Sequence, residues 1–396
     1  MCPTTDRPYR LGRTERRGAV LGWRPGQAAA VAGGATALVA GVSAGGAGVA
    51  VGLLGAVLGC VVAAVPVAGR GLDEWVPVAA CFVGRPRRGA LCAGASVQQR
   101  DGDVPAHLRW PDGRATVVAA VRHRGLRALG DDPRGYGEAL AGWLRGHAGV
   151  GAPRWTVTLL TSTGPGHGVR TAPWADPGAV SRAFVAVTAS SPAQVAQVLA
   201  EAGVAGAVEL DHDELDALLS SRVSPVAGTV LGTDLVARWH HVEAPASVHA
   251  AFSVEEWTAG EVDEQVLAPL CVARDRRTIA ITLRVEELRR ARDRTARVRT
   301  AGAADQALSA NAGFVASAEA ERDAARDDER AAELAAGHGA LRLVGVVALD
   351  AADPLELEAA AARLVADAAA CGLRLRRCDG DHRRGLLASV PGWVEP

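Results

Sequence analysis

Two groups of residues in this sequence have side chains that could bind a metal ion. Asp211-His212-Asp213-Glu214 offers carboxylates and an imidazole, the donor groups that hold divalent cations. His240, His241 and His249 could supply further ligands if the chain folds back there as a hairpin. Because adjacent residues of a strand point to opposite faces, at most two of these three imidazoles can meet.

A third group, Gly164-Pro165-Gly166-His167-Gly168, could hold an anion on its backbone amides. All three groups also have simpler explanations. The acids around Asp211 cap a helix predicted over 213–219, the neighbouring histidines belong to a hairpin, and the Gly/Pro run is a plain linker. We therefore predict no metal site and no cofactor.

Two clear sequence signatures of catalysis are missing from this chain. A phosphate-binding loop needs a lysine to reach the phosphates, and the chain contains no lysine at all. The zinc-protease pattern His-Glu-x-x-His does not occur either. We predict that the chain is not an enzyme.

The basic residues do not predict nucleic-acid binding. The net charge is −1, so no global field attracts polyanions. The densest basic run, 289–299, is interrupted by Asp293 and has no aromatic side chains for base stacking. It suits an acidic partner protein equally well.

The 7 cysteines are scattered and form no Cys-x-x-Cys pair. An odd number of cysteines without metal-ligand spacing indicates reduced thiols in a cytoplasmic protein.

The element that must position the rest of the chain is the uncharged stretch Gly26–Gly69. A membrane-spanning helix needs about 20 apolar residues, and this stretch is about twice that length. It divides at Ser43-Ala44-Gly45-Gly46, and its second half, 49–67, is the more apolar. The pattern predicts a two-helix transmembrane hairpin.

Arginines flank this stretch on both sides, which predicts that both of its ends are cytoplasmic. The N- and C-termini are then both inside, in a two-pass protein of the plasma (inner) membrane. The predicted interface anchors are Trp23, Arg24, Arg70 and Trp75.

Glycines four residues apart form the pairs Gly41/Gly45, Gly48/Gly52 and Gly55/Gly59, and the predicted packing residues are Gly48, Gly52, Gly55 and Gly59. Such spacing lets helices pack closely in lipid. Glycine is also abundant throughout the chain, with 46 residues, so the spacing has this second explanation.

Beyond the hairpin the pattern predicts an α+β fold, with cytoplasmic α/β sandwich domains. Residues 286–336 contain many charges and alanines and no proline, which predicts a long helical hairpin inserted in the second domain. The tail is predicted as strand 341–349, helix 355–370 opened by Asp353 and Pro354, and strands 373–376 and 386–390, half of a ferredoxin-like sandwich. The predicted divisions are a basic arm (1–25), the hairpin (26–69), a juxtamembrane helix and linker (70–103), one α+β domain (104–230) and a second (231–396).

Two segments resemble known families. The first is carried by Tyr9-Arg10-Leu11-Gly12, Glu15-Arg16-Arg17-Gly18, Leu21-Gly22-Trp23-Arg24-Pro25-Gly26-Gln27 and, after the two spans, Pro66-Val67-Ala68-Gly69-Arg70-Gly71-Leu72-Asp73-Glu74-Trp75-Val76-Pro77. It resembles actinobacterial two-pass membrane proteins related to the EccE component of type VII secretion. The second is carried by the charged helical region, Gly339-Ala340-Leu341-Arg342-Leu343-Val344-Gly345-Val346-Val347, Cys371-Gly372-Leu373 and Ser389-Val390-Pro391-Gly392. It is similar to the region before the motor domain of TraC-type conjugation ATPases.

These resemblances imply a non-catalytic integral membrane subunit of a secretion or conjugation-type complex. Its cytoplasmic domains would serve as a scaffold for a motor ATPase and other complex subunits, and the chain would contact membrane lipid. A homo-oligomer is a further option. Two alternatives stay open on the sequence: a membrane-anchored hydrolase with an unrecognised site, and a membrane-tethered sensor of a small ligand.

Overall fold

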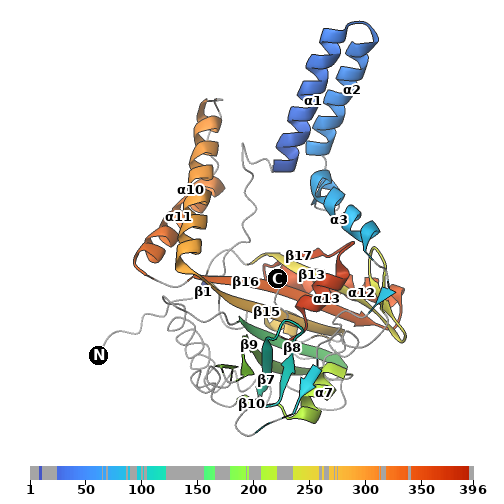
Figure 1. Cartoon of the computed structure of the whole chain (residues 1–396), viewed down its shortest axis with the longest axis vertical. Coiled ribbons are helices and arrows are strands. Elements are labelled where there is room, and N and C mark those ends of the chain that lie inside the picture. Colours follow the sequence, from blue (N-terminus) through green and yellow to red (C-terminus); the bar gives the residue numbers. More distant parts are fainter. Residues whose placement is uncertain are drawn as a thin grey trace. The chain divides into compact units, whose positions relative to one another are not determined.

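Figure 1 shows the computed structural model of the chain. The structure describes residues 9–10, 25–64, 66–67, 70–85, 88–89, 96–99, 101, 105–121, 156–165, 179–192, 194–195, 207–220, 235–257, 261–262, 267–271, 273, 275–311, 313, 318–337 and 340–391. The chain forms two compact units. Unit 1 contains Met1–Thr14, Pro86–Glu287 and Gly339–Pro396, and unit 2 contains Glu15–Arg85 and Leu288–His338.

The N-terminal part of unit 2 is a pair of helices, α1 (Pro25–Ala44) and α2 (Ala47–Ala64). Gly45 and Gly46 separate them with φ angles of 66° and 50°, which glycine adopts without steric cost. The predicted break at this position is confirmed. The helices run antiparallel, because the Gln27 side-chain amide near the start of α1 donates to Ala63 O near the end of α2 at 2.7 Å.

A small hairpin follows α2 and leads into a third helix. Strands β2 (Pro66–Val67) and β3 (Arg70–Gly71) pair antiparallel, and α3 (Leu72–Gly84) begins directly after them. Pro77 lies inside α3, and the helix ends where Arg85 N–H donates to Cys81 O.

The other part of unit 2 is the helix pair α10 (Leu288–Asn311) and α11 (Ala318–Ala335). The sequence predicts a break near Gly302 or Gly313; α10 continues through Gly302, and Gly313, with a φ angle of 80°, lies between the two helices. The Arg292 guanidinium donates to Leu334 O at 2.7 Å, and Arg299 forms an ion pair with Asp328 at 2.7 Å. These contacts join the beginning of α10 to the end of α11, so the two helices are antiparallel, as predicted for 286–336.

Unit 1 is built on one antiparallel sheet of 13 strands. Its strands are β4 (Arg88–Gly89), β5 (Ser96–Gln98), β6 (His107–Arg109), β7 (Ala115–Val121), β8 (Thr156–Pro165), β9 (Ala179–Ala189), β10 (Ala207–Glu209), β11 (Leu235–Ala237), β12 (Val242–Ala244), β13 (Ser247–Glu256), β15 (Arg276–Glu286), β16 (Ala340–Ala351) and β17 (Arg374–Arg377). Separately, β1 (Tyr9–Arg10) pairs with β14 (Glu261–Val262). The predicted α+β composition is therefore observed.

The two halves of the sheet have the same strand order. In the first half the neighbours are β10-β7-β9-β8, and in the second they are β17-β13-β16-β15. The halves join through antiparallel pairing of β8 with β15, from Arg277 opposite Thr163 to Arg284 opposite Thr156. The two domains predicted on either side of residue 230 therefore share one continuous sheet, because hydrogen bonding between distant strands extends across the predicted boundary.

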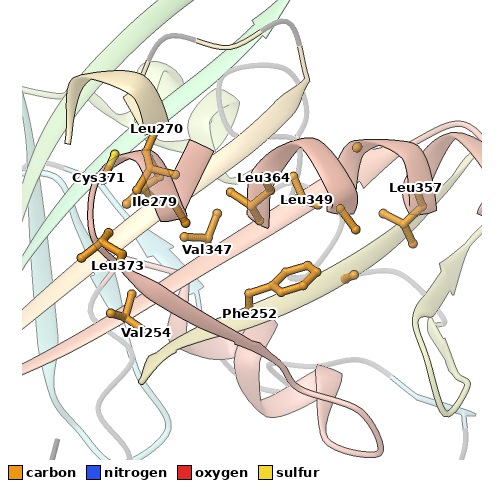
Figure 2. Close-up of a cluster of buried hydrophobic side chains, with 14 of the residues drawn as sticks. Phe252, Val254, Leu270, Ile279, Val347, Leu349, Leu357, Leu364, Cys371 and Leu373 are labelled. Atoms are coloured by element: carbon orange, nitrogen blue, oxygen red, sulfur yellow. The ribbon is translucent and has the colours of Figure 1, made fainter. Parts of the chain in front are cut away.

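Helices cover the two faces of the second half. On one face, α12 (Pro354–Ala370) packs Leu357 and Leu364 onto Phe252 and Leu349 (Figure 2), and α9 (Ala268–Cys271) adds Leu270 to this cluster. On the other face, α7 (His212–Ser220) and α13 (His382–Ala388) join a cluster that also includes residues from both halves of the sheet. Alternate residues of β13 serve the two clusters, as the period of a strand requires.

The tail contains one confirmed prediction and one error. Helix α12 begins as predicted: Asp353 accepts from Glu356 N at 2.8 Å, the Glu356 carboxylate accepts from Ala352 N at 2.9 Å, and Pro354 occupies the first turn. The strand predicted over 386–390 is wrong, since α13 covers most of these residues. A short apolar run does not distinguish a strand from a helix, and Gly385 allows this helix to approach Ala251 of the sheet closely.

Candidate functional site

The acidic group at Asp211 is a helix cap. Asp211 precedes α7, and its carboxylate accepts from Glu214 N at 2.7 Å. In return the Glu214 carboxylate accepts from Asp211 N at 3.2 Å, which completes a reciprocal capping pair. The capping explanation is confirmed, and within the described ranges no cluster of three or more His, Cys, Asp or Glu side chains could hold a metal ion.

The structure does not bring the three candidate histidines together. His240 lies 3.1 Å from Asp379, and His241 lies 3.4 Å from Glu243. His249 lies next to Ser247 and Asp350 instead. Of the glycine-rich segment, Gly164 and Pro165 belong to strand β8, and residues 166–168 lie outside the described residues.

A buried polar cluster forms around His249 on the face of the sheet that α13 covers. The Ser247 hydroxyl lies 3.0 Å from His249 Nε2, and Asp350 of β16 lies 3.3 Å from His249 Nδ1. Arg276 approaches the same carboxylate at 3.6 Å. Sequence reasoning missed Ser247 and Asp350, because only the register of β13 with β16 places Asp350 opposite His249.

Serine, histidine and aspartate together are the residue types used for nucleophilic catalysis. This is the one geometric observation that favours the hydrolase alternative. The His249 side chain is only 1% exposed, however, so a substrate cannot reach its imidazole in this conformation. We therefore assign the cluster a structural role.

Burial has opposite effects on the two ionisable groups of this cluster. It lowers the pKa of His249 to about 4 and raises the pKa of Asp350 to about 6. For Asp350, the charge of Arg276 and hydrogen bonds from Arg276 and Ser247 oppose the rise. At neutral pH the imidazole is neutral.

The pH dependence of stability around His249 follows from these values. As the pH falls, the unfolded chain protonates His249 before the folded chain does, because the folded pKa is lower. The stability of the folded chain is therefore highest above pH 6.5 and decreases as the pH falls toward 4. We expect the stability advantage of the native chain over His249→Gln to shrink by about 2 kcal/mol between pH 7 and pH 5.

Asp350→Asn provides the control of opposite sign. The stabilising contribution of the raised Asp350 pKa is complete below pH 3.8 and is lost as the pH rises toward 6. The stability of the native chain relative to Asp350→Asn should therefore increase as the pH falls. Thermal unfolding of the three proteins at pH 5, 6 and 7 measures both trends. A constant difference between the native chain and either variant would contradict the assignment.

A second polar cluster holds α13 on the sheet. His382 Nδ1 accepts a hydrogen bond from Ala251 N–H at 3.1 Å, so this nitrogen carries no proton. Burial lowers the pKa of His382, against the effect of Asp379. Burial alone would raise the pKa of Asp379, but hydrogen bonds from His382 and His240 and the charge of Arg377 outweigh it and lower that pKa.

The predicted packing glycines lie where α2 meets α1. A Cβ atom at Gly52 would lie 2.8 Å from Ala37 O, and one at Gly59 would lie 2.5 Å from Ala30 O. At Gly55 it would lie 2.9 Å from the Ala37 side chain, and at Gly48 it would lie 2.8 Å from the Ala44 side chain. These contacts are within one chain, between backbones that only glycine allows to approach so closely.

The structure also shows contact glycines on the α1 side. Gly34 and Gly41 are buried against α2, and Gly34 was not singled out in the sequence. Its spacing of seven residues from Gly41 was the available signal. Gly41, Ser43 and Gly45 fit the hydrolase pattern Gly-x-Ser-x-Gly, but Ser43 lies in the last turn of α1, where its hydroxyl donates to Val39 O at 2.9 Å, and not at a strand-to-helix turn.

The predicted interface anchors are described only in part. Trp23 and Arg24 lie outside the described residues. Trp75 lies in the first turn of α3, and Arg70 belongs to strand β3. Their role at a membrane interface stays a prediction.

One helix in the described part of the chain, Gly26–Ala44, is long and apolar enough to cross a membrane, with a mean hydropathy of 1.4. The apolar segments Ala47–Ala63 and Glu74–Gly84 are shorter. No protein-family model matches this chain, and a search of curated proteins finds no match either. Function is therefore inferred from these residues and their contacts.

Proposed function

We propose that this chain is a non-catalytic membrane subunit of a secretion or conjugation-type transport complex. The observation that carries the proposal is the outward face of the α1–α2 pair, which has no charged side chain. Its exposed large apolar residues are Val39, Val42, Val51, Leu53, Leu54, Val57, Leu58 and Val61. Soluble proteins rarely expose an apolar surface of this extent, and a lipid bilayer would cover it.

Strand pairing supports a two-pass topology for α1 and α2. The chain before α1 reaches unit 1 as β1, which pairs with β14, and the chain after α3 reaches unit 1 as β4, which pairs with β11. A single compact unit lies on one side of a membrane, so an even number of crossings fits between these strands. The flanking arginines favour the cytoplasmic side.

The scaffold role is supported by the shape of the soluble elements. Helices α10 and α11 are inserted between β15 and β16, and most of their side chains are exposed, which suits a partner surface. The neighbour order β17-β13-β16-β15, antiparallel throughout, supports the ferredoxin-like description of the tail. The sequence resemblances to EccE-like proteins and to the pre-motor region of TraC-type ATPases make a motor ATPase the expected partner, in the type VII or the conjugation kind of system.

Reporter fusions test the membrane topology. A fluorescent reporter placed after Arg88 should be active only in the cytoplasm, and alkaline phosphatase inserted between Gly45 and Gly46 should be active only outside. Deleting α1 and α2 should release the chain from the membrane fraction. Cytoplasmic activity at the Gly45 position would exclude the two-pass arrangement.

Affinity purification from solubilised membranes tests the assignment to a complex. We expect a motor ATPase and membrane subunits to be recovered with the native chain, and to be lost when α10 and α11 are replaced by a short glycine linker. The α1–α2 pair and the sheet remain in that variant, so its membrane fraction serves as the control. Recovery of this chain alone from native membranes would refute the subunit proposal.

A further inference from the structure

Helix α3 has an exposed face without a charged side chain. Val76 and Val83 are 68% and 75% exposed, and Ala80 on the same side is exposed as well. Residues 76, 80 and 83 follow the i, i+4, i+7 spacing of one helix face. In the segment 74–85, charged residues occur only at the ends, at Glu74 and Arg85.

The apolar part of α3 is too short to cross a bilayer. At about 1.5 Å per residue, Glu74–Gly84 covers about 16 Å, roughly half of the hydrocarbon thickness of about 30 Å. A short helix with one apolar face is instead suited to lie along the membrane surface.

The surroundings of α3 identify what covers this face. In unit 2, α3 contacts both α1 and α2, so it lies next to the proposed membrane anchor. Arginines surround the helix in the sequence, at Arg70 before it and at Arg85, Arg87 and Arg88 after it. Such charges favour anionic headgroups.

We propose that α3 lies in the headgroup region of an anionic bilayer, with Val76, Ala80 and Val83 against the acyl chains. The flanking arginines bind the lipid phosphates. This places a second lipid contact between the anchor and the sheet unit, and it rests on the proposed membrane anchoring of α1 and α2.

Single-cysteine probes on the full chain test this contact. Ala80→Cys places a probe on the apolar face of α3, and the native cysteines are changed to serine. Leu54→Cys, in the middle of α2 at 70% exposure, reports on the anchor, and Leu355→Cys, on α12 at 83% exposure, reports on water. Each protein is labelled with a polarity-sensitive fluorophore and reconstituted in vesicles of phosphatidylcholine and phosphatidylglycerol that carry doxyl quenchers at shallow or deep acyl positions.

We expect shallow doxyl groups to quench the Ala80→Cys probe at least threefold more than the Leu355→Cys probe. Deep doxyl groups should quench the Leu54→Cys probe most strongly. Replacing phosphatidylglycerol with phosphatidylcholine should reduce quenching at Ala80→Cys and leave it unchanged at Leu54→Cys. Adding Val76→Asp and Val83→Asp should bring the Ala80→Cys signal down to that of the water probe, whereas Val365→Asp, which changes an exposed valine of α12, should have no effect.

The outcomes separate the two levels of inference. If the Ala80→Cys probe behaves like the Leu355→Cys probe while Leu54→Cys is quenched, the surface role of α3 is refuted and the anchor stands. If the Ala80→Cys probe is shielded from both doxyl and aqueous iodide, a protein covers this face and the lipid contact is likewise refuted. If Leu54→Cys is not quenched, the anchoring itself fails.

Discussion

Gly52→Ile is expected to break the contact between α1 and α2. The first side-chain carbon would lie 2.8 Å from Ala37 O, an atom of the α1 backbone that cannot move aside without moving the helix. Overpacking of this kind costs about 2 kcal/mol, which corresponds to roughly 30-fold faster amide exchange in both helices. Hydrogen–deuterium exchange of the full chain in detergent micelles measures the change.

Gly33→Ile is the matched control for this prediction. It adds the same side chain to α1 at a position where a Cβ atom meets nothing within 4 Å. It should therefore leave the exchange rates of α2 unchanged. Gly59→Ile should reproduce the effect of Gly52→Ile, because its Cβ would meet Ala30 O at 2.5 Å. Equal exchange in Gly33→Ile and Gly52→Ile would show that the close contact does not hold the pair together.

Arg277→Ala is expected to destabilise the sheet unit severely. The Arg277 side chain is 1% exposed and joins β15 to α12 through Asp367 at 2.8 Å, with Asp275 at 3.3 Å on its other side. Arg277→Ala leaves a cavity at a buried position and takes one partner from Asp367 and Asp275, although Arg363 still pairs with Asp275. We expect a loss of roughly 3 kcal/mol, which lowers the Tm by roughly 6–10 °C.

The neighbouring residue supplies the control for Arg277. Arg276 precedes it on the same strand, but its side chain is 58% exposed and its carboxylate partner Asp350 lies 3.6 Å away. Asp350 is buried, but the 3.6 Å separation makes the pair weak, and a carboxyl with a pKa of about 6 can take up a proton when the arginine is removed. Arg276→Ala should therefore lower the Tm by a few degrees at most. Thermal unfolding followed by circular dichroism compares the two variants. A similar Tm for both would contradict the assigned role of Arg277.

Local signals in the sequence predicted the elements that depend on near neighbours. The cap and proline at Asp353 and Pro354 located the start of α12, and the glycines at 45 and 46 located the break between α1 and α2. The capping pair of Asp211 and Glu214 was likewise predictable, since both partners lie within one turn.

Features that depend on pairing between distant strands could not be predicted in this way. Asp350 is opposite His249 only because of the register of β16 on β13, and no local pattern near either residue indicates it. The junction of β8 with β15 likewise depends on hydrogen bonds between strands far apart in the sequence. The strand predicted over 386–390 was wrong for another reason: five apolar and small residues fit a strand as well as a short helix.

The repeated strand order means that each half of the sheet contains the same four-strand module. Each module alone would end in a long open edge, β8 in one and β15 in the other, with unpaired backbone groups that invite aggregation. Although α10 and α11 are inserted after β15 in the second module, pairing of β8 with β15 within one polypeptide covers each edge with the other.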